Sequence, residues 1–375
     1  MSEINPLFEP LALGTLELPN RIVVAPMCQY SASDGSATDW HLQHWSQLGY
    51  SGAGWVVVEA TAVERRGRIT HGCLGLYSDD NEATIARALA AARRFAGPTR
   101  FGIQLAHAGR KASNRVPWLG GGPLPPAEDP WQTVGPSAVP YAEGWNVPHA
   151  LTEAEIEELV EKFVAAARRA VRAGFDIVEL HCAHGYLLHE FLSPLSNQRT
   201  DRFGGSLESR MRFPLMTLRA LREALPSSVP LGIRVSATDW VEGGWDIEQT
   251  VRFVRAARDV GVEFVCASSG GNAPVKVPVE PGYQVPFAER IKREVGIKTR
   301  AVGLIVEAQQ AAAVVAEGRA DLVALARAFL DDPRWGWHAA DALGATAHFP
   351  SPYHMARSPG WKTIKDDVLK RLSLV

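Results

Sequence analysis

The chain alternates eight short apolar runs with segments of helical periodicity, and this alternation restricts the possible folds more than any other feature. The runs cover residues 21–27, 55–60, 100–106, 175–181, 231–237, 264–269, 299–303 and 322–327. Most of them are continuously apolar, as expected of parallel strands that are covered on both faces. Amphipathic helices are predicted at residues 81–96, 152–174, 207–224, 247–260, 284–294 and 306–317. Eight strand–helix units favour an α/β fold closed into a single (β/α)8 TIM barrel, with an open doubly wound sheet as the competing topology.

Composition fits a large globular protein and excludes several other classes. The 375 residues are 46% hydrophobic and 21% charged, which is enough to bury a large core. The net charge of −2 and the pI near 6.6 give no sign of a nucleic-acid-binding surface. The cysteines are too scattered for a disulfide framework or a Cys-x-x-Cys pair, since they lie at Cys28, Cys73, Cys182 and Cys266. We see no signal peptide or membrane-spanning run and expect a soluble cytoplasmic protein.

One connection is far longer than an ordinary βα loop. It runs from Ala112 to Pro148, after the third predicted strand, and is rich in proline, glycine and tryptophan. A long ordered loop at this end of a barrel is often a lid over the site, although a plug or an oligomer contact explains it equally well. We expect residues 1–348 to form the barrel and residues 349–375 to form a C-terminal tail.

The stretch FDIVELHCAHGYL at residues 175–187 carries the densest group of reactive side chains. It begins as a buried strand and delivers His181, His184 and Tyr186 to the carboxyl end, where barrel active sites lie. Two imidazoles can donate hydrogen bonds to one substrate oxygen, and a phenol can supply a proton. Two alternatives are a metal pair, for which no third carboxylate or cysteine ligand is evident nearby, and a purely structural role.

Other strand ends would converge on the same mouth. Gln104 and Arg234 could bind the pyrimidine edge of a flavin, and Arg234 near N1 would stabilise the negative charge of the reduced ring. Gly303 and the backbone before Arg327 follow the seventh and eighth strands, a common phosphate site in barrels. A flavin fits these residues better than a metal does. The alternative is an ion pair of Arg234 inside the barrel with either of two glutamates, Glu59 or Glu179.

Four longer segments resemble the Old Yellow Enzyme family of flavin-dependent ene reductases. They are APMCQYSASDG at 25–35, QLAHAGRKA at 104–112, ELHCAHGYLLHEFLSPLSNQRTDRFGGSLESRMRF at 179–213 and IRVSATDW at 233–240. Within the family they are most similar to the cysteine-containing branch that includes YqjM and xenobiotic reductase A. The resemblance extends from Leu7 to about Arg334 and implies a non-covalently bound FMN at the barrel mouth.

The resemblance assigns FMN contacts along the strand ends. The matching positions are Ala25, Pro26, Met27, Cys28, Ala60, Gln104, Arg234, Gly303, Ala326 and Arg327. Ala326 departs from the family, which has glycine before its phosphate-binding arginine, and alanine is compatible with that position if φ is negative. NADPH is the implied electron donor, with NADH as the other possibility.

Catalytic roles are implied in the same way. His181 and His184 would hold the carbonyl or nitro oxygen of an activated alkene. Hydride would pass from flavin N5 to the β-carbon, and Tyr186 would protonate the α-carbon. NAD(P)H would reduce the flavin and leave before the alkene binds, which is a ping-pong cycle.

Further residues are implied to contact the substrate. Cys28 and Tyr30 would line the pocket with the two histidines and Tyr186, and the Cys28 thiol would tune the flavin rather than act as a nucleophile. Arg357 in the tail would reach the active site of a neighbouring subunit in a homodimer or homotetramer.

Other functions stay open at this point. The acceptor could be a quinone or a nitro compound instead of an alkene. A metal-dependent barrel hydrolase and a non-enzymatic flavin-binding module are the alternatives from other classes. A dienoyl-CoA reductase is disfavoured, because the scattered cysteines cannot hold an iron–sulfur cluster.

Overall fold

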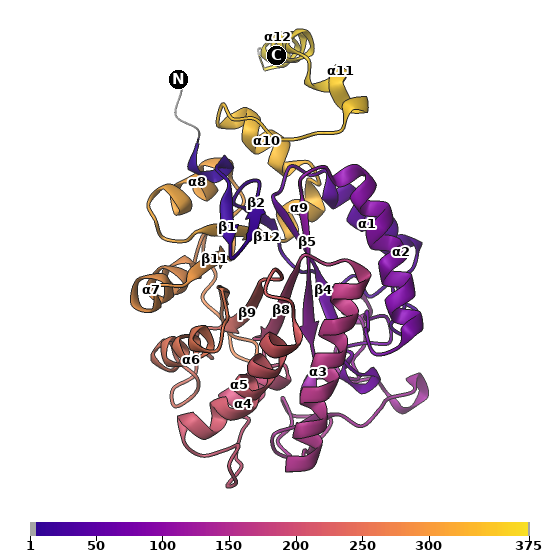
Figure 1. Ribbon diagram of the computed structural model, residues 1–375, viewed down its shortest axis with the longest axis vertical. Coiled ribbons are helices and arrows are strands. Elements are labelled where there is room, and N and C mark those ends of the chain that lie inside the picture. The colour runs from indigo at the N-terminus through magenta and orange to yellow at the C-terminus, as the bar shows by residue number, and fades with distance from the viewer. Residues whose placement is uncertain (1–4, 374–375) are drawn as a thin grey trace.

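The computed structural model describes residues 5–373, and its centre is a closed barrel of parallel strands (Figure 1). The strands follow the chain order around the barrel, and the last one pairs with the first. They are β3 Ile22–Val24, β4 Trp55–Ala62, β5 Arg100–Ala106, β8 Ile177–Cys182, β9 Leu231–Ser236, β10 Phe264–Ser268, β11 Lys298–Val302 and β12 Leu322–Leu325. Each strand falls on one of the predicted runs, so the predicted barrel is confirmed. Residues 1–4 of the predicted barrel region and 374–375 of the predicted tail lie outside the described residues.

Helices cover the outside of the barrel (Figure 1). Those between consecutive strands are α1 Asp39–Gly49, α2 Asp79–Ala96, α3 Glu153–Ala173, α4 Leu187–Leu192, α5 Leu207–Ala224, α6 Ile247–Asp259, α7 Val285–Val295 and α8 Ala308–Ala316. Helix α1 is not among the helices predicted from the sequence. Its buried face includes His41 and His44 beside Trp45 and Leu48, so polar residues interrupt the apolar periodicity by which a helix is recognised.

An N-terminal hairpin closes the amino end of the barrel. Its strands, β1 (Leu11–Leu13) and β2 (Leu16–Leu18), are antiparallel. The buried leucines of this hairpin pack against the first residues of four barrel strands, which are Trp55, Ile177, Phe264 and Leu322. Because this end is sealed by apolar contacts, a ligand must enter the barrel from the carboxyl ends of the strands.

The long excursion after β5 is ordered and reaches the mouth. The turn η3 (Gly109–Lys111) leads into it, and the turns η4 (Pro117–Leu119) and η5 (Pro126–Glu128) lie within it. Its two-residue strand β6 (Val134–Gly135) pairs with β7 (His149–Ala150), which follows directly after it. Trp118 in η4 packs edge-on against Tyr30, with ring centroids 5.7 Å apart. The excursion therefore covers the segment that follows β3.

The chain ends in a helical extension. Helix α9 (Arg327–Asp331) follows the last strand, and α10 (Trp335–Ala342) leads into α11 (His354–Arg357) and α12 (Pro359–Leu372), which stand away from the barrel (Figure 1). Within residues 5–373, no helix combines the length and the apolarity needed to cross a lipid bilayer.

Candidate active site

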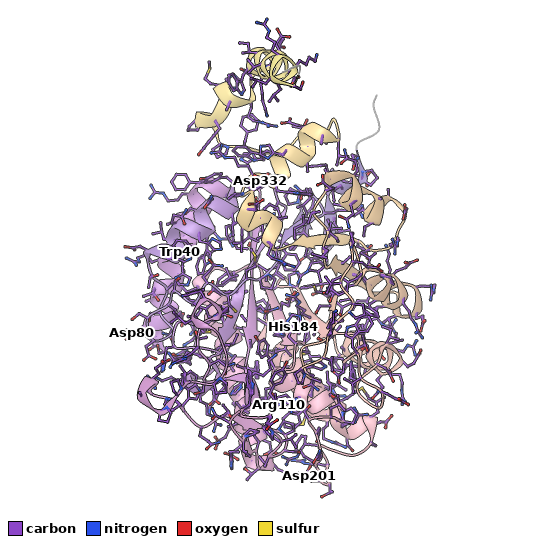
Figure 2. The ribbon with its side chains drawn as sticks, turned by 180° about the vertical axis from the view of Figure 1, so that it is seen from behind. Trp40, Asp80, Arg110, His184, Asp201 and Asp332 are labelled. Carbon is purple, nitrogen blue, oxygen red and sulfur yellow. The ribbon has the colours of Figure 1, made fainter. Side chains whose placement is uncertain are left out.

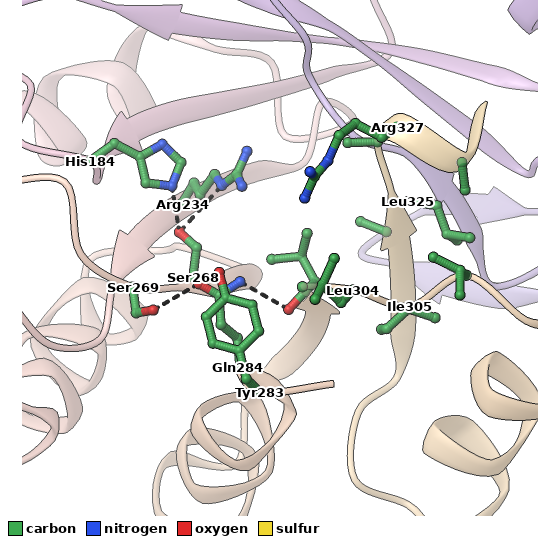
Figure 3. A pocket seen from close by; sticks show the side chains of 16 residues that line it. His184, Arg234, Ser268, Ser269, Tyr283, Gln284, Leu304, Ile305, Leu325 and Arg327 are labelled. Atoms are coloured by element: carbon green, nitrogen blue, oxygen red, sulfur yellow. Dashed lines mark hydrogen bonds between the residues drawn. The ribbon is translucent and has the colours of Figure 1, made fainter. Parts of the chain in front are cut away.

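A cavity of about 210 Å³ opens at the carboxyl ends of β9 to β12 (Figure 3). It brings together five residues that the sequence assigns to the site, namely His184, Arg234, Gly303, Ala326 and Arg327. In Figure 2, His184 lies near the centre of the molecule, where the strands converge. Strand-end positions far apart in the sequence thus share one cavity, as parallel barrel topology predicts.

Two guanidinium groups give this cavity its charge, and they extend into it from different sides (Figure 3). Arg234 belongs to β9, and its Nε lies 3.4 Å from the Oγ of Ser268, which is long for a hydrogen bond. Arg327 is the first residue of α9. No aspartate or glutamate is among the described residues that line the cavity, so an anion would meet uncompensated positive charge there.

Backbone conformation on the same wall requires glycine at one position and tolerates alanine at another. Gly303 has a φ of +117°, and a Cβ there would lie 2.6 Å from Nε2 of Gln284, which donates to the Val302 carbonyl at 3.1 Å. Ala326 has a φ of −110°, so it meets the condition of a negative φ. Substituting alanine for the family's glycine therefore adds no left-handed strain at residue 326.

The two histidines and the tyrosine gather beside this cavity. The centre of the His181 ring lies 5.1 Å from the centre of the His184 ring and 5.0 Å from that of the Tyr186 ring, and both pairs are edge-on. Nδ1 of His181 accepts a hydrogen bond from the Ala183 N–H at 3.1 Å, so the neutral ring carries its proton on Nε2. Nε2 of His184 lies 2.9 Å from the Oγ of Ser268. Of the three side chains, His184 lines the cavity and Tyr186 lines a smaller neighbouring one.

Burial keeps all three side chains uncharged near neutral pH. Burial is the main cause that lowers the pKa of both His181 and His184 well below the usual histidine value, and the nearby positive charge of Arg234 is the second. Burial raises the pKa of Tyr186 well above its usual value. The arrangement can therefore offer imidazole N–H donors and a phenolic proton without carrying charge.

The smaller cavity, of about 10 Å³, lies at the carboxyl ends of β4 and β5. Its walls include Ala60 and Tyr186, two residues assigned to the site from the sequence. Cys28 and Tyr30 follow β3 and share a side-chain hydrogen bond, and burial raises the pKa of both groups. Ala25, Pro26, Met27 and Gln104 line neither cavity, although each lies at or beside a barrel strand.

Inside the barrel, Glu179 pairs with a residue that the sequence analysis does not single out. Its Oε2 lies 2.5 Å from Nη2 of Arg300, and both side chains are fully buried. Its Oε1 accepts a hydrogen bond from Nε2 of Gln104 at 2.7 Å. Glu59 Oε1 lies 3.7 Å from Nε2 of His41 and accepts from the Gln29 N–H at 3.1 Å. Among the described residues Arg234 forms an ion pair with neither Glu59 nor Glu179, so that alternative is wrong. Glu179 instead orients the amide of Gln104.

Lys111 is a further site residue, and its position within QLAHAGRKA at 104–112 does not by itself predict a role. Its Nζ donates to the carbonyl oxygens of His184 and Gly271 at 2.9 and 2.8 Å. The same nitrogen lies 5.4 Å from the centre of the Tyr186 ring. Its position five residues after β5 is the signal that could have marked it, because that position falls at the carboxyl end of a strand.

Replacing Lys111 by methionine is expected to change how stability depends on pH. Burial lowers the pKa of Lys111 to about 8, against about 10.4 in an unfolded chain. Between about pH 8 and 10 the unfolded state holds more of this proton, so the wild-type free energy of unfolding should rise with pH relative to Lys111→Met. Urea unfolding across this range measures the difference, and exposed Lys365→Met is the control. A wild-type minus variant difference that stays flat in pH would contradict the burial argument.

Arg357 is not brought to the barrel mouth of its own chain. It forms an ion pair with Asp341 in α10, with Nη1 and Nη2 lying 2.5 and 2.8 Å from the carboxylate oxygens. Its guanidinium also lies over the rings of Trp337 and Phe349. Contact of Arg357 with a neighbouring subunit's active site stays a prediction.

Similarity to known proteins agrees with this site. The model of the NADH:flavin oxidoreductase / NADH oxidase family matches residues 6–344. An NADPH dehydrogenase of Geobacillus sp. (strain WCH70) is 42% identical over 358 residues, covering 95% of this chain and 98% of that protein. An NADPH dehydrogenase of Listeria innocua is 41% identical over 361 residues, covering 96% and 100%.

Solved structures show the same architecture. Morphinone reductase superimposes with a TM-score of 0.75 at 30% identity, covering 94% of this chain and 93% of that one. A 2-naphthoyl-CoA reductase gives a TM-score of 0.81 at 23% identity over 91% of this chain and 52% of that one, which is a likeness of fold. Together with the family model, these relatives confirm the resemblance drawn from the strand-end motifs. The chain belongs to the NADH:flavin oxidoreductase / NADH oxidase family, the Old Yellow Enzyme family.

Proposed function

We propose that this protein is an FMN-dependent NADPH dehydrogenase that reduces the activated C=C bond of α,β-unsaturated carbonyl or nitro compounds. The observation that carries the proposal is the convergence of His181, His184 and Tyr186 beside a cavity with two guanidinium groups and no carboxylate. The description of the family supports the flavin, and the names of the bacterial relatives support NADPH as the donor.

The donor set of the cavity fits FMN. Arg327, with the backbone at Gly303 and Ala326, would hold the phosphate, because the cavity is positively charged. Residue 303 is glycine, so no side chain would keep the phosphate from the backbone there. Arg234 would face the N1 edge of the ring. Gln104 would meet the pyrimidine edge with its amide oxygen, since Glu179 engages the amide nitrogen. When bound, FMN supplies hydride-transfer chemistry between NADPH and the alkene.

The two imidazoles would both hold the substrate oxygen through the Nε2 N–H. His181 donates from Nε2, because its Nδ1 accepts from the Ala183 N–H. The Ser268 hydroxyl donates to the Val235 carbonyl at 2.9 Å, because a carbonyl oxygen can only accept. Its oxygen then accepts from His184 Nε2 at 2.9 Å, and His184 would share this N–H with the substrate oxygen. Two such donors stabilise the negative charge that builds up on the substrate oxygen.

Tyr186 would complete the reaction by giving a proton to the α-carbon. Its ring lies edge-on to His181, so the phenol and the imidazoles would contact adjacent atoms of one bound substrate. Because its pKa is raised, the phenol keeps its proton until the substrate develops negative charge.

An anaerobic absorbance experiment tests the proposal. The purified protein should show a flavin spectrum that bleaches on addition of NADPH and recovers on addition of 2-cyclohexenone. Bleaching without recovery would move the electrons to another acceptor, with quinones and nitro compounds tested next. A colourless protein that cannot be reconstituted with FMN would overturn the proposal and return the histidines to a metal or structural role.

Replacing His181 and His184 together by alanine is expected to weaken binding of 2-cyclohexenone and of p-chlorophenol by about 10–100-fold, because two hydrogen bonds to the ligand oxygen are lost. FMN should stay bound, since neither imidazole is assigned to its phosphate. Titration of the flavin spectrum with each ligand measures the effect. The control is the double variant His71→Ala/His149→Ala, which removes two exposed imidazoles. Loss of FMN from the His181/His184 variant would instead make the pair structural.

A further inference from the structure

The turn from Ala183 to Tyr186 has an unusual backbone that must be held in place. His184 and Gly185 are both left-handed, with φ of +60° and +71°. The conformation is unfavourable for a histidine, and a Cβ on Gly185 would collide with the Gly271 carbonyl oxygen. This turn, hereafter the 183–186 turn, sets the directions in which His184 and Tyr186 point.

Side chains from three different elements hold its backbone groups. Ser236 in β9 accepts from the His184 N–H at 2.9 Å, and Lys111 in η3 donates to the His184 carbonyl at 2.9 Å. His189 in α4 (Leu187–Leu192) accepts from the Gly185 N–H through Nδ1 at 2.9 Å. His189 therefore holds the centre of the turn.

Asp239 determines which nitrogen of His189 carries the proton. His189 Nε2 lies 3.1 Å from Oδ1 of Asp239, and both side chains are fully buried. Neither atom forms a hydrogen bond with any other group in the described part of the chain, and despite burial their mutual contact lowers the pKa of Asp239, so only these two atoms can satisfy each other. Nε2 must then carry the proton, and Nδ1 is left as the acceptor that Gly185 needs.

The same device occurs a second time at the mouth. Nδ1 of His107 accepts from the Gly109 N–H at 3.0 Å, and its Nε2 lies 2.8 Å from Oε1 of Glu64. Gly109 is also left-handed, with a φ of +59°, and opens the η3 turn that carries Lys111. Carboxylate, imidazole and glycine N–H thus form two matching clamps, and Lys111 links the second clamp to the 183–186 turn.

We infer that His189, with its tautomer fixed by Asp239, is a positioning residue that holds His184 and Tyr186 in their reactive directions. It acts through the Gly185 N–H and touches neither substrate nor flavin. The inference rests on the proposed function for the roles of His184 and Tyr186, but the geometry of the clamp does not depend on it.

Asp239→Asn tests the inference because the surroundings dictate how the new amide must lie. Oδ2 of Asp239 accepts from the Ser193 hydroxyl at 2.6 Å and from the Trp245 N–H at 2.9 Å. The single oxygen of asparagine must take that place, which turns its NH2 group towards His189 Nε2. The imidazole then has to shift its proton to Nδ1, where it opposes the Gly185 N–H.

The expected result is a loss confined to the steps that need the turn. Reoxidation of the reduced protein by 2-cyclohexenone and binding of p-chlorophenol should weaken by about 10–100-fold. Reduction by NADPH and FMN affinity should change by less than about threefold. Nitrogen NMR of the histidine rings should show His189 protonated at Nε2 in the wild type and at Nδ1 in Asp239→Asn. The matched control is Asp321→Asn, a buried aspartate at the amino end of β12.

A second pair of variants keeps the inference testable if Asp239→Asn does not fold. His189→Asn places an amide oxygen near the position of Nδ1 and should retain much of the enone reaction. The leucine side chain of His189→Leu cannot accept a hydrogen bond from the Gly185 N–H, so this variant should lose the enone reaction. Equal rates for the two variants, or an Asp239→Asn that slows both half-reactions alike, would make His189 merely structural.

Failure of the proposed function gives a different pattern. If the wild type does not reduce enones, the tautomer seen by NMR and the affinity for p-chlorophenol still decide the inference. An unchanged tautomer in Asp239→Asn overturns it whatever the reaction is.

Discussion

Tyr186→Phe is expected to slow reoxidation of the reduced protein by 2-cyclohexenone by about 10²–10⁴-fold, the usual contribution of a positioned general acid. Reduction by NADPH should be unchanged within about twofold, because the tyrosine is assigned no part in it. The substitution removes one oxygen and keeps the ring that packs edge-on against His181 at 5.0 Å. Anaerobic stopped-flow absorbance separates the two half-reactions in one preparation.

Tyr141→Phe is the matched control, because it removes a phenolic oxygen from a ring that also lies beside Lys111, at 4.6 Å from Nζ. Its half-reactions should both match the wild type. The pKa of Tyr186 is raised and that of His181 lowered, so neither group should titrate in the wild-type enone step between about pH 7 and 9. A change in rate within this range is expected to come from Lys111, whose pKa is about 8. Equal slowing of both half-reactions in Tyr186→Phe would mean that the hydroxyl orients the flavin or the pocket and does not deliver the proton.

The barrel could be predicted because most strands are buried on both faces and therefore appear in the sequence as largely apolar runs. Residues Ile177–Cys182 of β8 are all buried, for example, despite including Glu179 and His181. Helix α1 could not be predicted, because its buried face contains histidines, which a sequence pattern assigns to a solvent-facing polar side. The β1–β2 hairpin also escapes prediction, because its strands of three residues are too short to show alternation.

Strand direction determines which residues lie at the barrel mouth, and this part of the candidate site could be predicted. Carboxyl ends of parallel strands share one mouth, and this places Arg234, His184 and Gly303 together without any knowledge of their contacts. Pairing across the barrel interior is a different problem. Glu179 in β8 and Arg300 in β11 meet through the lumen of the closed barrel, and neither spacing nor periodicity encodes which inward residues will touch. Lys111 reaches the site only because Gly109 turns the chain with a positive φ.

Glu179→Leu is expected to lower the free energy of unfolding by about 3–5 kcal/mol, because it leaves the Arg300 guanidinium buried without its counter-ion. Nε and Nη1 of Arg300 lack hydrogen-bond partners among the described residues, and no second carboxylate pairs with the guanidinium there. The remaining favourable contacts are with the Cys266 side chain and with the Trp55 and Phe264 rings, whose centres lie 4.7 and 5.9 Å away. Urea unfolding of the flavin-free protein measures the loss. Glu208→Leu, which breaks an exposed pair with Arg252, should cost no more than about 1 kcal/mol.

The double variant Glu179→Leu/Arg300→Met separates the stability of the barrel from the orientation of the site. Removing both charges should restore most of the stability, since an apolar pair needs no compensation in a dry interior. FMN affinity should stay low in both variants, because Gln104 loses the acceptor that holds its amide nitrogen at 2.7 Å. A double variant as unstable as Glu179→Leu would assign the loss to packing and not to charge. Recovery of FMN affinity along with stability would show that Gln104 needs a well-folded barrel and not the Glu179 carboxylate.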